Sequence, residues 1–120
     1  MSRDRRAAER AGRLAEYAAA ARLILTGHRI LLMRFKAKGG EIDIVARRGG
    51  TVALIEVKRR PSLDEAIDAV GPRTRRRIEQ AARTLLAARP DLQDTALRFD
   101  IIASAGWRLR HVKGAWLEGD

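Results

Sequence analysis

Residues 39–60, GGEIDIVARRGGTVALIEVKRR, carry the strongest structural signal in the chain, since apolar residues alternate with charged ones on both sides of a glycine pair. This pattern predicts two antiparallel strands joined at Gly49-Gly50 by a two-residue turn with positive φ at both glycines. Counting outward from the turn places Asp43 directly opposite Glu56, with both side chains on one face. The stretch is therefore predicted to be a β-hairpin that gathers carboxylates toward one end.

Lys58 joins the two acids on that face. It lies two residues beyond Glu56, and the same count places it across from Glu41. A turn at Arg48-Gly49 would instead make Asp43 a diagonal neighbour of Glu56 on the same face, whereas a three-residue loop without a bulge would separate them. The register of the turn therefore determines whether these charges meet.

The two faces of the hairpin are both partly apolar. One face is expected to carry Ile42, Ile44, Ile55 and Val57, and the acidic face Val45, Val52 and Leu54. A sheet that is apolar on both faces is usually covered on both sides. We therefore expect the hairpin to lie inside the protein.

The paired acids predict a metal site. Two carboxylates side by side in a partly buried place repel each other and lose hydration, which a cation or a proton relieves. Mg²⁺, or Mn²⁺ in its place, binds one or two carboxylates and keeps several waters. We expect Asp43 and Glu56, with the Val57 carbonyl, to bind the metal and Lys58 to orient or deprotonate an attacking water. The alternative is a salt-bridged end of the sheet in which Lys58 neutralises one acid.

Composition limits the classes of protein to which the chain can belong. With 120 residues and 46% hydrophobic content, it is expected to form a single domain over residues 1–120. The sequence contains no cysteine, which excludes disulfides and thiolate zinc sites. Because there is no secretory signal and no apolar run near the roughly 20 residues of a membrane span, we expect a cytoplasmic protein without a membrane partner.

The net charge of +10 favours a polyanionic partner. Nucleic acid is the natural candidate, with DNA as the first choice. An alternative explanation stays open, because 21 of the 25 basic residues are Arg and Ala is abundant, a bias that GC-rich coding produces by itself.

Outside the hairpin the sequence predicts short, closely joined elements. A helix over residues 3–25 has Ser2 as its N-cap and, in its second half, an almost all-round apolar surface that predicts burial. Ser62 and Glu65 form a predicted capping box at the start of a short helix. The remaining predictions are the end of that helix at Gly71, a longer helix over 72–89, and strands over 28–35, 97–104 and 107–116.

Two motifs in the hairpin resemble a nuclease signature. GEID (40–43) and EVK (56–58), with twelve residues between Asp43 and Glu56, resemble the D-x(n)-(D/E)-x-K signature of the restriction-endonuclease-like PD-(D/E)xK nuclease superfamily. More narrowly, nearly the whole chain resembles the YraN-like family of uncharacterised bacterial proteins. The segments that carry this likeness, in the family's order, are GRLAEYAA, GHRIL, GGEIDIVA, IEVKRR, AVGPRTRRRIEQAA and RFDIIA.

The resemblance implies an α/β fold with a restriction-endonuclease-like αβββαβ core, in which helices flank both faces of a mixed central sheet, similar to archaeal Holliday junction resolvases. It implies a metal-dependent nuclease that hydrolyses phosphodiester bonds in DNA, including structured or branched forms, with Mg²⁺ or Mn²⁺ as cofactor. It also implies a homodimer. The catalytic residues that it implies are Glu16, Asp43, Glu56 and Lys58.

Arginines near this site are the expected contacts to nucleic-acid phosphates. The family usually has a Lys where this chain has Thr74, and an Arg-x-Gly-Glu run where this chain has residues 38–41. We expect these departures to affect the contacts to phosphate more than the metal chemistry. The expected phosphate-binding residues are Arg59, Arg73, Arg75, Arg76 and Arg77.

Other residues carry weaker signals. His28 and His111 lack a partner at a metal-ligand spacing, so both are expected to be strand residues. Trp107 and Trp116 either stack on bases or pack in a core or interface, and the sequence leaves both alternatives open. Asp100 alternates with apolar neighbours and is expected to make structural hydrogen bonds.

Three functions fit these observations. The first is the metal-dependent nuclease, the second a non-catalytic nucleic-acid-binding or partner-recruiting module on the same fold, and the third a basic ribosome-associated structural protein. The intact acids and Lys58 favour the first over the second, since binding alone does not need paired acids facing a polyanion. The third leaves Asp43 and Glu56 unexplained.

Overall fold

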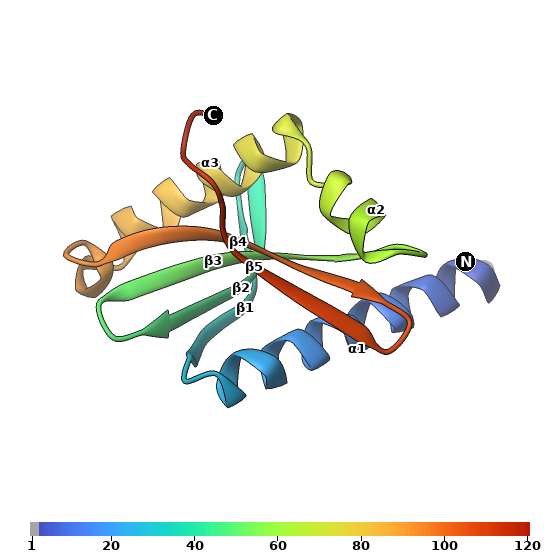
Figure 1. The fold of residues 1–120 in the computed structure, drawn as a ribbon. Coiled ribbons are helices and arrows are strands. Elements are labelled where there is room, and N and C mark those ends of the chain that lie inside the picture. Colours follow the sequence, from blue (N-terminus) through green and yellow to red (C-terminus); the bar gives the residue numbers. More distant parts are fainter. Residues whose placement is uncertain (1–2) are drawn as a thin grey trace.

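The central feature of the computed structural model, which describes residues 3–120, is a five-stranded sheet with the strand order β1-β2-β3-β4-β5 (Figure 1). Strands β3 and β4 run parallel, and the other neighbouring pairs are antiparallel. The elements in chain order are α1 (Arg3–Leu25), β1 (Arg29–Ala37), β2 (Gly40–Arg48), β3 (Thr51–Arg59), α2 (Leu63–Asp68), α3 (Pro72–Ala88), the 3₁₀ helix η1 (Pro90–Leu92), β4 (Ala96–Ala105) and β5 (Arg108–Trp116).

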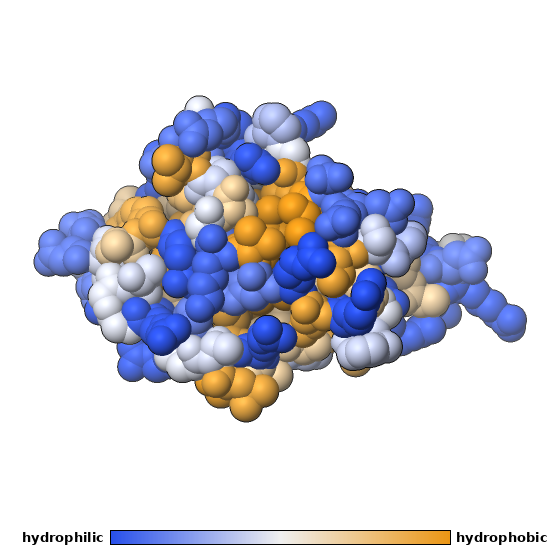
Figure 2. Space-filling model, in the orientation of Figure 1, coloured by the Kyte–Doolittle hydropathy of each residue, from blue (hydrophilic) through white to orange (hydrophobic). Residues whose placement is uncertain are grey.

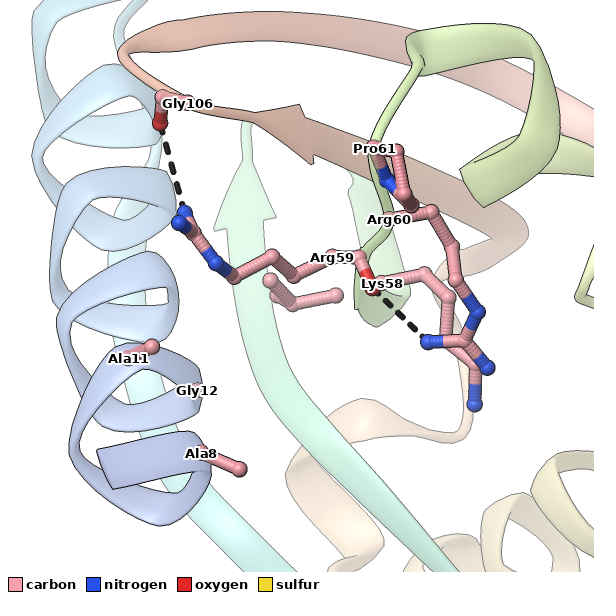
Figure 3. A pocket seen from close by; sticks show the side chains of 9 residues that line it. Ala8, Ala11, Gly12, Lys58, Arg59, Arg60, Pro61 and Gly106 are labelled. Carbon is pink, nitrogen blue, oxygen red and sulfur yellow. Dashed lines mark hydrogen bonds between the residues drawn. The ribbon is translucent and has the colours of Figure 1, made fainter. Parts of the chain in front are cut away.

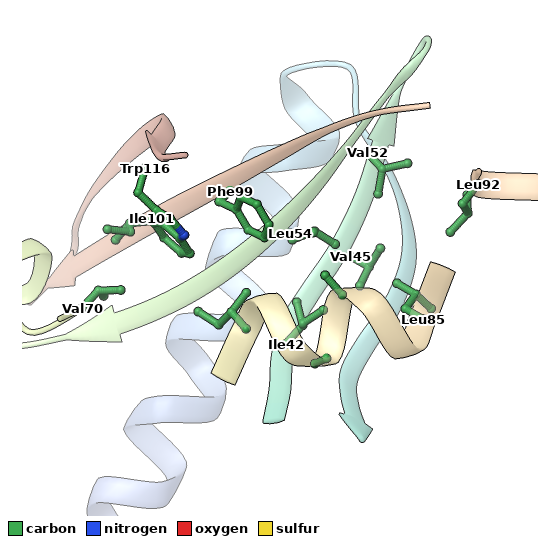
Figure 4. Packing of buried hydrophobic residues seen from close by; sticks show 13 residues of the cluster. Ile42, Val45, Val52, Leu54, Val70, Leu85, Leu92, Phe99, Ile101 and Trp116 are labelled. Carbon is green, nitrogen blue, oxygen red and sulfur yellow. The ribbon is translucent and has the colours of Figure 1, made fainter. Parts of the chain in front are cut away.

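Helices cover both faces of the sheet, with α1 on one face and α2 and α3 on the other (Figure 1). Each face has its own apolar core. The core under α1 includes Ala19, Leu23, Ile44, Ile55 and Ile102. The core under α3 includes Val45, Val52, Leu54, Leu85, Phe99 and Ile101 (Figure 4). The predicted α/β class and the mixed sheet flanked by helices are therefore confirmed, and the arrangement is compatible with a restriction-endonuclease-like fold.

The helices lie close to their predicted bounds because local signals mark their ends. Helix α1 occupies the predicted range, whereas its predicted cap, Ser2, lies outside the described residues. The capping box at α2 is confirmed, since Glu65 N donates to Ser62 Oγ and Ser62 N donates to a Glu65 carboxylate oxygen. Helix α2 ends at Asp68 rather than at the predicted Gly71.

The prediction that the second half of α1 is buried is wrong. Tyr17 is 62% exposed and Leu25 is 84% exposed, and Figure 2 shows an apolar patch over the C-terminal end of the helix. Only the side that faces the sheet is buried, through Ala15, Ala19 and Leu23, which lie four residues apart. Within residues 3–120, neither α1 nor any other helix combines the length and apolarity needed to cross a bilayer.

The hairpin turn forms at Gly49-Gly50 in the predicted register. Arg48 pairs with Thr51, and the pairing continues to Ile44 and Ile55. Gly49 has a φ of 58°, whereas Gly50 has no positive φ, so the prediction of two positive φ values is wrong. A turn with positive φ at its first central residue alone is the other two-residue hairpin type, and it gives the same register.

Strand β2 bends away from β3 at Asp43. Its pairing with β3 ends at Ile44, but its pairing with β1 continues through Ile42 to Gly40. Gly40 lies directly against α3, where an added Cβ would collide with the carbonyl oxygen of Arg77. The first residues of β2 therefore follow β1 toward α3.

The bend overturns two predictions about the faces of the hairpin. Ile42 packs into the core under α3, on the same side as Val45, although strict alternation placed it on the opposite face. Lys58 does not pair with Glu41, because the β2–β3 pairing ends at Ile44 and Ile55, and Glu41 pairs only with Lys36 of β1. Alternation predicts faces only along a regular strand, and contact with α3 interrupts that regularity.

Candidate functional site

Asp43 stands at the bend of β2, and its side chain is fixed against β3. Its Oδ2 accepts a hydrogen bond of 2.8 Å from the backbone N–H of Val57. This N–H lies beyond Ile44 and Ile55, the last pair of the β2–β3 ladder. The Asp43 carboxylate therefore accepts the hydrogen bond that a backbone carbonyl of β2 would accept in a continued ladder. The half-buried Asp43 is thereby held at the edge of β3 beside Glu56.

Glu56, the neighbouring acid on β3, lies in surroundings that disfavour its ionised form. Burial raises the pKa of Glu56 to about 9, and the Asp43 carboxylate adds to the rise both as a hydrogen-bond partner and as a negative charge. The positive charge of Lys58 lowers the pKa of Glu56, whereas the negative charge of Glu41 raises it. Two carboxylates that share a proton in a half-buried place form a site in which a cation can replace that proton.

A cleft of about 300 Å³ opens between this part of the sheet and α3. The sheet lines it with carboxylates and an ammonium, and α3 lines it with arginines. Arg73 and Arg77 lie four residues apart, so they share one side of α3. The residues around the cleft are Glu41, Glu56, Lys58, Arg73, Thr74, Arg77 and Ile78. The cleft therefore combines an acidic floor with a basic wall.

Glu16 of α1 is linked to the site through Arg34, a residue that the sequence did not single out. Arg34 Nε donates a hydrogen bond of 2.7 Å to Glu16 Oε1. The Glu16 carboxylate raises the pKa of Arg34, and the Asp43 carboxylate contributes to the same shift. Arg34 has a φ of 55° and stands opposite Asp43 at the bend. The sequence does not distinguish Arg34 from Arg29 and Lys36, the other basic residues of β1.

Two of the predicted phosphate-binding arginines, Arg75 and Arg76, have partners away from the cleft. The Arg75 guanidinium lies over the Trp116 ring, 5.2 Å from its centroid. Arg76 donates to a Glu79 carboxylate oxygen at 2.9 Å and to the Asp120 carbonyl at 2.6 Å. Both side chains therefore hold the C-terminal segment against α3 rather than facing Lys58.

Arg59 points to the other side of β3 from Lys58. Its Nη1 donates a hydrogen bond of 3.3 Å to the carbonyl of Gly106 in the β4–β5 turn (Figure 3). Consecutive strand residues alternate faces, so Arg59 cannot line the cleft that Lys58 lines. Its predicted contact with phosphate thus belongs to a different surface from that of Arg73 and Arg77.

The donor set fits a hard divalent cation that keeps most of its ligands as water. Within residues 3–120, no three His, Asp or Glu side chains come together as a group able to hold an ion. Asp43 and Glu56 provide the one or two carboxylates that Mg²⁺ normally takes from a protein. The Val57 carbonyl stays a predicted third ligand, on a residue whose N–H already contacts Asp43.

A second polar cluster is buried around Asp100, which pairs with Ile55 across the β3–β4 ladder. His111 Nε2 lies 2.8 Å from Asp100 Oδ2, Arg98 donates to the same carboxylate, and Arg98 Nη2 lies 3.0 Å from His28 Nε2. Burial by itself would raise the pKa of Asp100, but His111, Arg98 and the Gly114 N–H lower it overall. Across the described residues every buried side-chain nitrogen and oxygen has a partner, so this cluster is a satisfied structural network. His111 lies in β5 as predicted, whereas His28 precedes β1.

Known sequences related to this chain share nearly its full length. The profile of uncharacterised protein family UPF0102 matches residues 15–103, a range that contains Glu16, Asp43, Glu56 and Lys58. A UPF0102 protein of Paramagnetospirillum magneticum is 48% identical over 120 residues, which are 96% of this chain and 93% of the relative. Others are a UPF0102 protein of Maricaulis maris, 45% identical over 100% of this chain and 95% of the relative, and one of Bradyrhizobium sp., 50% identical over 96% of this chain and 82% of the relative. The chain therefore belongs to the UPF0102 family, as its YraN-like motifs predicted.

Proposed function

We propose that this protein is a metal-dependent nuclease of the PD-(D/E)xK superfamily that hydrolyses phosphodiester bonds in DNA. The observation that carries the proposal is the pair of Asp43 and Glu56 beside a cleft that also holds Lys58, Arg73 and Arg77. A pair of acids facing a polyanion is repulsive unless a cation lies between them and the phosphate. The paired acids beside Lys58 and the two arginines therefore support a cation between the protein and the phosphate.

Each side chain has a defined role in this proposal. A Mg²⁺ or Mn²⁺ ion held by Asp43 and Glu56 supplies a water of lowered pKa and neutralises charge on the scissile phosphate. Lys58 orients or deprotonates the attacking water and stabilises the phosphate charge. Glu16, held by Arg34, accepts hydrogen bonds from ordered water on the α1 side of the site. Arg73 and Arg77 hold the phosphates that flank the cleavage position.

Structured or branched DNA is the proposed substrate, on the likeness to Holliday junction resolvases described above. The same likeness supports a homodimer, which sedimentation equilibrium of the purified protein tests directly. The total charge of +10 supports nucleic acid as the partner.

The experiment compares cleavage with binding in matched variants. The purified protein is given a four-way junction, a flap, a single strand and a plain duplex, with Mg²⁺ or Mn²⁺. Lys58→Ala should lower cleavage by orders of magnitude while DNA binding and metal binding largely survive. Glu56→Gln should damage metal binding and cleavage together, because an amide is a poorer ligand for a hard cation. Lys113→Ala, which removes a surface ammonium on β5, is the control and should cleave normally.

The competing function is a non-catalytic nucleic-acid-binding or partner-recruiting module. Thr74 favours it, because this residue lines the cleft where the family usually has a Lys, and a hydroxyl holds phosphate less strongly than an ammonium. If the wild-type protein binds these DNAs but cuts none at any metal concentration, the competing function replaces the nuclease. If Lys58→Ala and Glu56→Gln cut as well as the wild type, the proposed roles are wrong.

A further inference from the structure

An open groove leads out of the candidate site along the end of β3. Because β2 leaves β3 at Asp43, the last residues of β3 have an open edge. A hollow of about 590 Å³ lies at this end of β3, beside the N-terminal half of α1 (Figure 3). Lys58 lines both this hollow and the site cleft, so the two spaces meet at its side chain.

The groove then reaches Trp107 in the β4–β5 turn. Arg59 and Gly106 line the hollow beside β3, and they also line a third hollow of about 280 Å³ whose wall includes Trp107. The ring lies near the site: Lys58 pairs with Ala103, four residues before Trp107 in the chain. At about 3.3 Å per extended residue, this separation is at most on the order of 13 Å along the sheet, because β4 ends at Ala105 and the chain then turns. Trp107 is therefore within a few nucleotides of the proposed cleavage position.

Small residues form one side of the groove, and basic residues line the rest of it. Ala8, Ala11 and Gly12 of α1 line it, and their small side chains leave the space beside β3 open (Figure 3). Arg59 and Arg60 add two guanidinium groups to the ammonium of Lys58, and the described residues that line these two hollows include no acid. A phosphate backbone therefore meets only attractive charge along this path.

Trp107 is an aromatic platform at the end of the groove. The side chain is 91% exposed, whereas Trp116 is 5% exposed and donates a hydrogen bond to Glu79. The turn that carries Trp107 is held by Arg59, which bonds the carbonyl of Gly106. A large apolar ring left in water beside a basic groove is the arrangement on which an unpaired base stacks.

We infer that Trp107 stacks on an unpaired base, and that the substrate is a nucleic acid with a single-stranded segment next to the cleavage position. The inference rests on the proposed function and specifies its substrate. A base inside a duplex is stacked on both faces and cannot offer one to Trp107. A second copy of this chain is the weaker candidate for the same surface, because it would bring like-charged arginine side chains together.

Binding without cleavage tests the inference directly. Fluorescence anisotropy in EDTA compares a labelled single strand, a duplex with a single-stranded extension and a blunt hairpin duplex. Trp107→Ala should weaken binding of the first two by roughly 5- to 150-fold, the loss of one stacked base, and leave the blunt duplex within about twofold. Trp107→Phe should restore most of the affinity. Leu25→Ala, which removes an apolar side chain that is 84% exposed at the other end of α1, is the control and should change nothing.

Intrinsic fluorescence gives an independent reading of the same contact. Single-stranded DNA should quench the wild-type emission, because Trp107 is exposed, and should barely change the emission of Trp107→Phe, because Trp116 is buried. The inference would be overturned if Trp107→Ala lost equal affinity for the single strand and the blunt duplex, or lost affinity for neither. A wild-type dimer that becomes a monomer in Trp107→Ala without a change in DNA affinity would also overturn it.

These outcomes separate the inference from the proposed function. A protein that binds single strands through Trp107 but never cuts disproves the nuclease alone. A protein whose cleavage requires Lys58 but whose binding is indifferent to Trp107 disproves the stacking platform alone.

Discussion

Arg34 and Glu16 form an ion pair, with 2.7 Å between Nε and Oε1, that fastens β1 to helix α1 opposite the bend of β2. Arg34 stands opposite Asp43 and, among residues 3–120, is the one non-glycine residue with a positive φ. Left-handed backbone costs an ordinary residue roughly 1–2 kcal/mol. The β1 backbone opposite the bend therefore stores strain beside the candidate metal ligands.

Comparing two substitutions at Arg34 isolates this strain. Arg34→Ala and Arg34→Gly both remove the ion pair, but only glycine accepts the positive φ freely. We expect Arg34→Gly to be more stable than Arg34→Ala by about 1 kcal/mol, measured by urea denaturation. Equal midpoints would show that the positive φ carries no strain. Both variants should cut DNA more slowly than the wild type, because Glu16 loses the group that holds it.

Gly40→Ala should destabilise the protein and disturb the site. The added Cβ would collide with the Arg77 carbonyl, so β2 or α3 must shift, at a cost of about 1–3 kcal/mol. Gly50→Ala is the matched control, since that glycine has no atom within 4 Å of an added Cβ and no positive φ, and its stability should stay within about 0.5 kcal/mol of the wild type. Thermal unfolding of the two variants checks this. If both behave alike, the contact between Gly40 and α3 does not determine the path of β2.

Mg²⁺ or Mn²⁺ should raise the melting temperature of the wild type but not of Asp43→Asn. A ligand that binds only the folded state stabilises it by about 2.7 kcal/mol at a hundredfold excess over Kd. Asp94→Asn removes an exposed carboxylate away from the site and should respond like the wild type. Scanning fluorimetry with EDTA or with millimolar Mn²⁺ measures the difference. Identical melting temperatures in the two buffers would count against a metal site at Asp43 and Glu56.

In metal-free protein the stability should fall as the pH rises from 7 to 9. The folded-state pKa of Glu56 is raised from 4.5 to about 9, so folded Glu56 holds a proton that the unfolded chain releases. The contribution of this proton to the free energy of unfolding is complete below pH 4.5 and is lost as the pH rises through about 9. The free energy of unfolding then falls by at most about 1.4 kcal/mol per pH unit.

Glu56→Gln should remove this dependence on pH, because the amide does not titrate. The pKa values of His28 and Asp100 are lowered, so both groups titrate at more acidic pH and do not change the stability between pH 7 and 9. Urea denaturation of both proteins at several pH values in EDTA provides the measurement. A slope that persists in Glu56→Gln belongs to another group. Metal ligands bind in their deprotonated form, so added Mg²⁺ should stabilise the wild type more at pH 9 than at pH 7.

The α3 arginines should separate into two functional pairs. Replacing Arg73 and Arg77 with Ala should flatten the log-log dependence of DNA affinity on salt by up to roughly 0.9 for each lost phosphate contact. Replacing Arg75 and Arg76 should lower stability and leave the slope nearly unchanged, because these two bind the C-terminal segment. Titrations between low and moderate salt distinguish the pairs. The opposite pattern would move the DNA surface to the other side of α3.

The parts of the fold that the sequence predicts correctly depend on neighbouring residues. The capping box of Ser62 and Glu65 marks α2, and the glycine pair sets the β2–β3 register that brings Asp43 toward Glu56. These signals act within a few residues, so a single chain reveals them. The roles of Asp43, Glu56 and Lys58 stay predictions that the experiments above test.

The features that the sequence missed depend on contacts between distant elements. The bend at Arg34 and Asp43 arises where Gly40 meets α3, and alternation along a strand does not encode that meeting. Burial of α1 was predicted from its apolar residues, but burial also needs a second element to cover the outer side of the helix. The sequence predicts that Arg75 contacts phosphate, because a helical pattern does not show that Trp116 of a distant strand packs beneath its guanidinium.

The turn at Gly49-Gly50 lies at the opposite end of the β2–β3 ladder from the site, five paired positions away from the bend. An added Cβ at either glycine meets no atom within 4 Å, so the tip of the hairpin is open to solvent. A fluorophore attached at Gly50, which has no positive φ and keeps the two-residue turn, would report on the protein without blocking the groove or the cleft. The hairpin thus provides an attachment point for surface immobilisation and single-molecule work that leaves the groove and the cleft free.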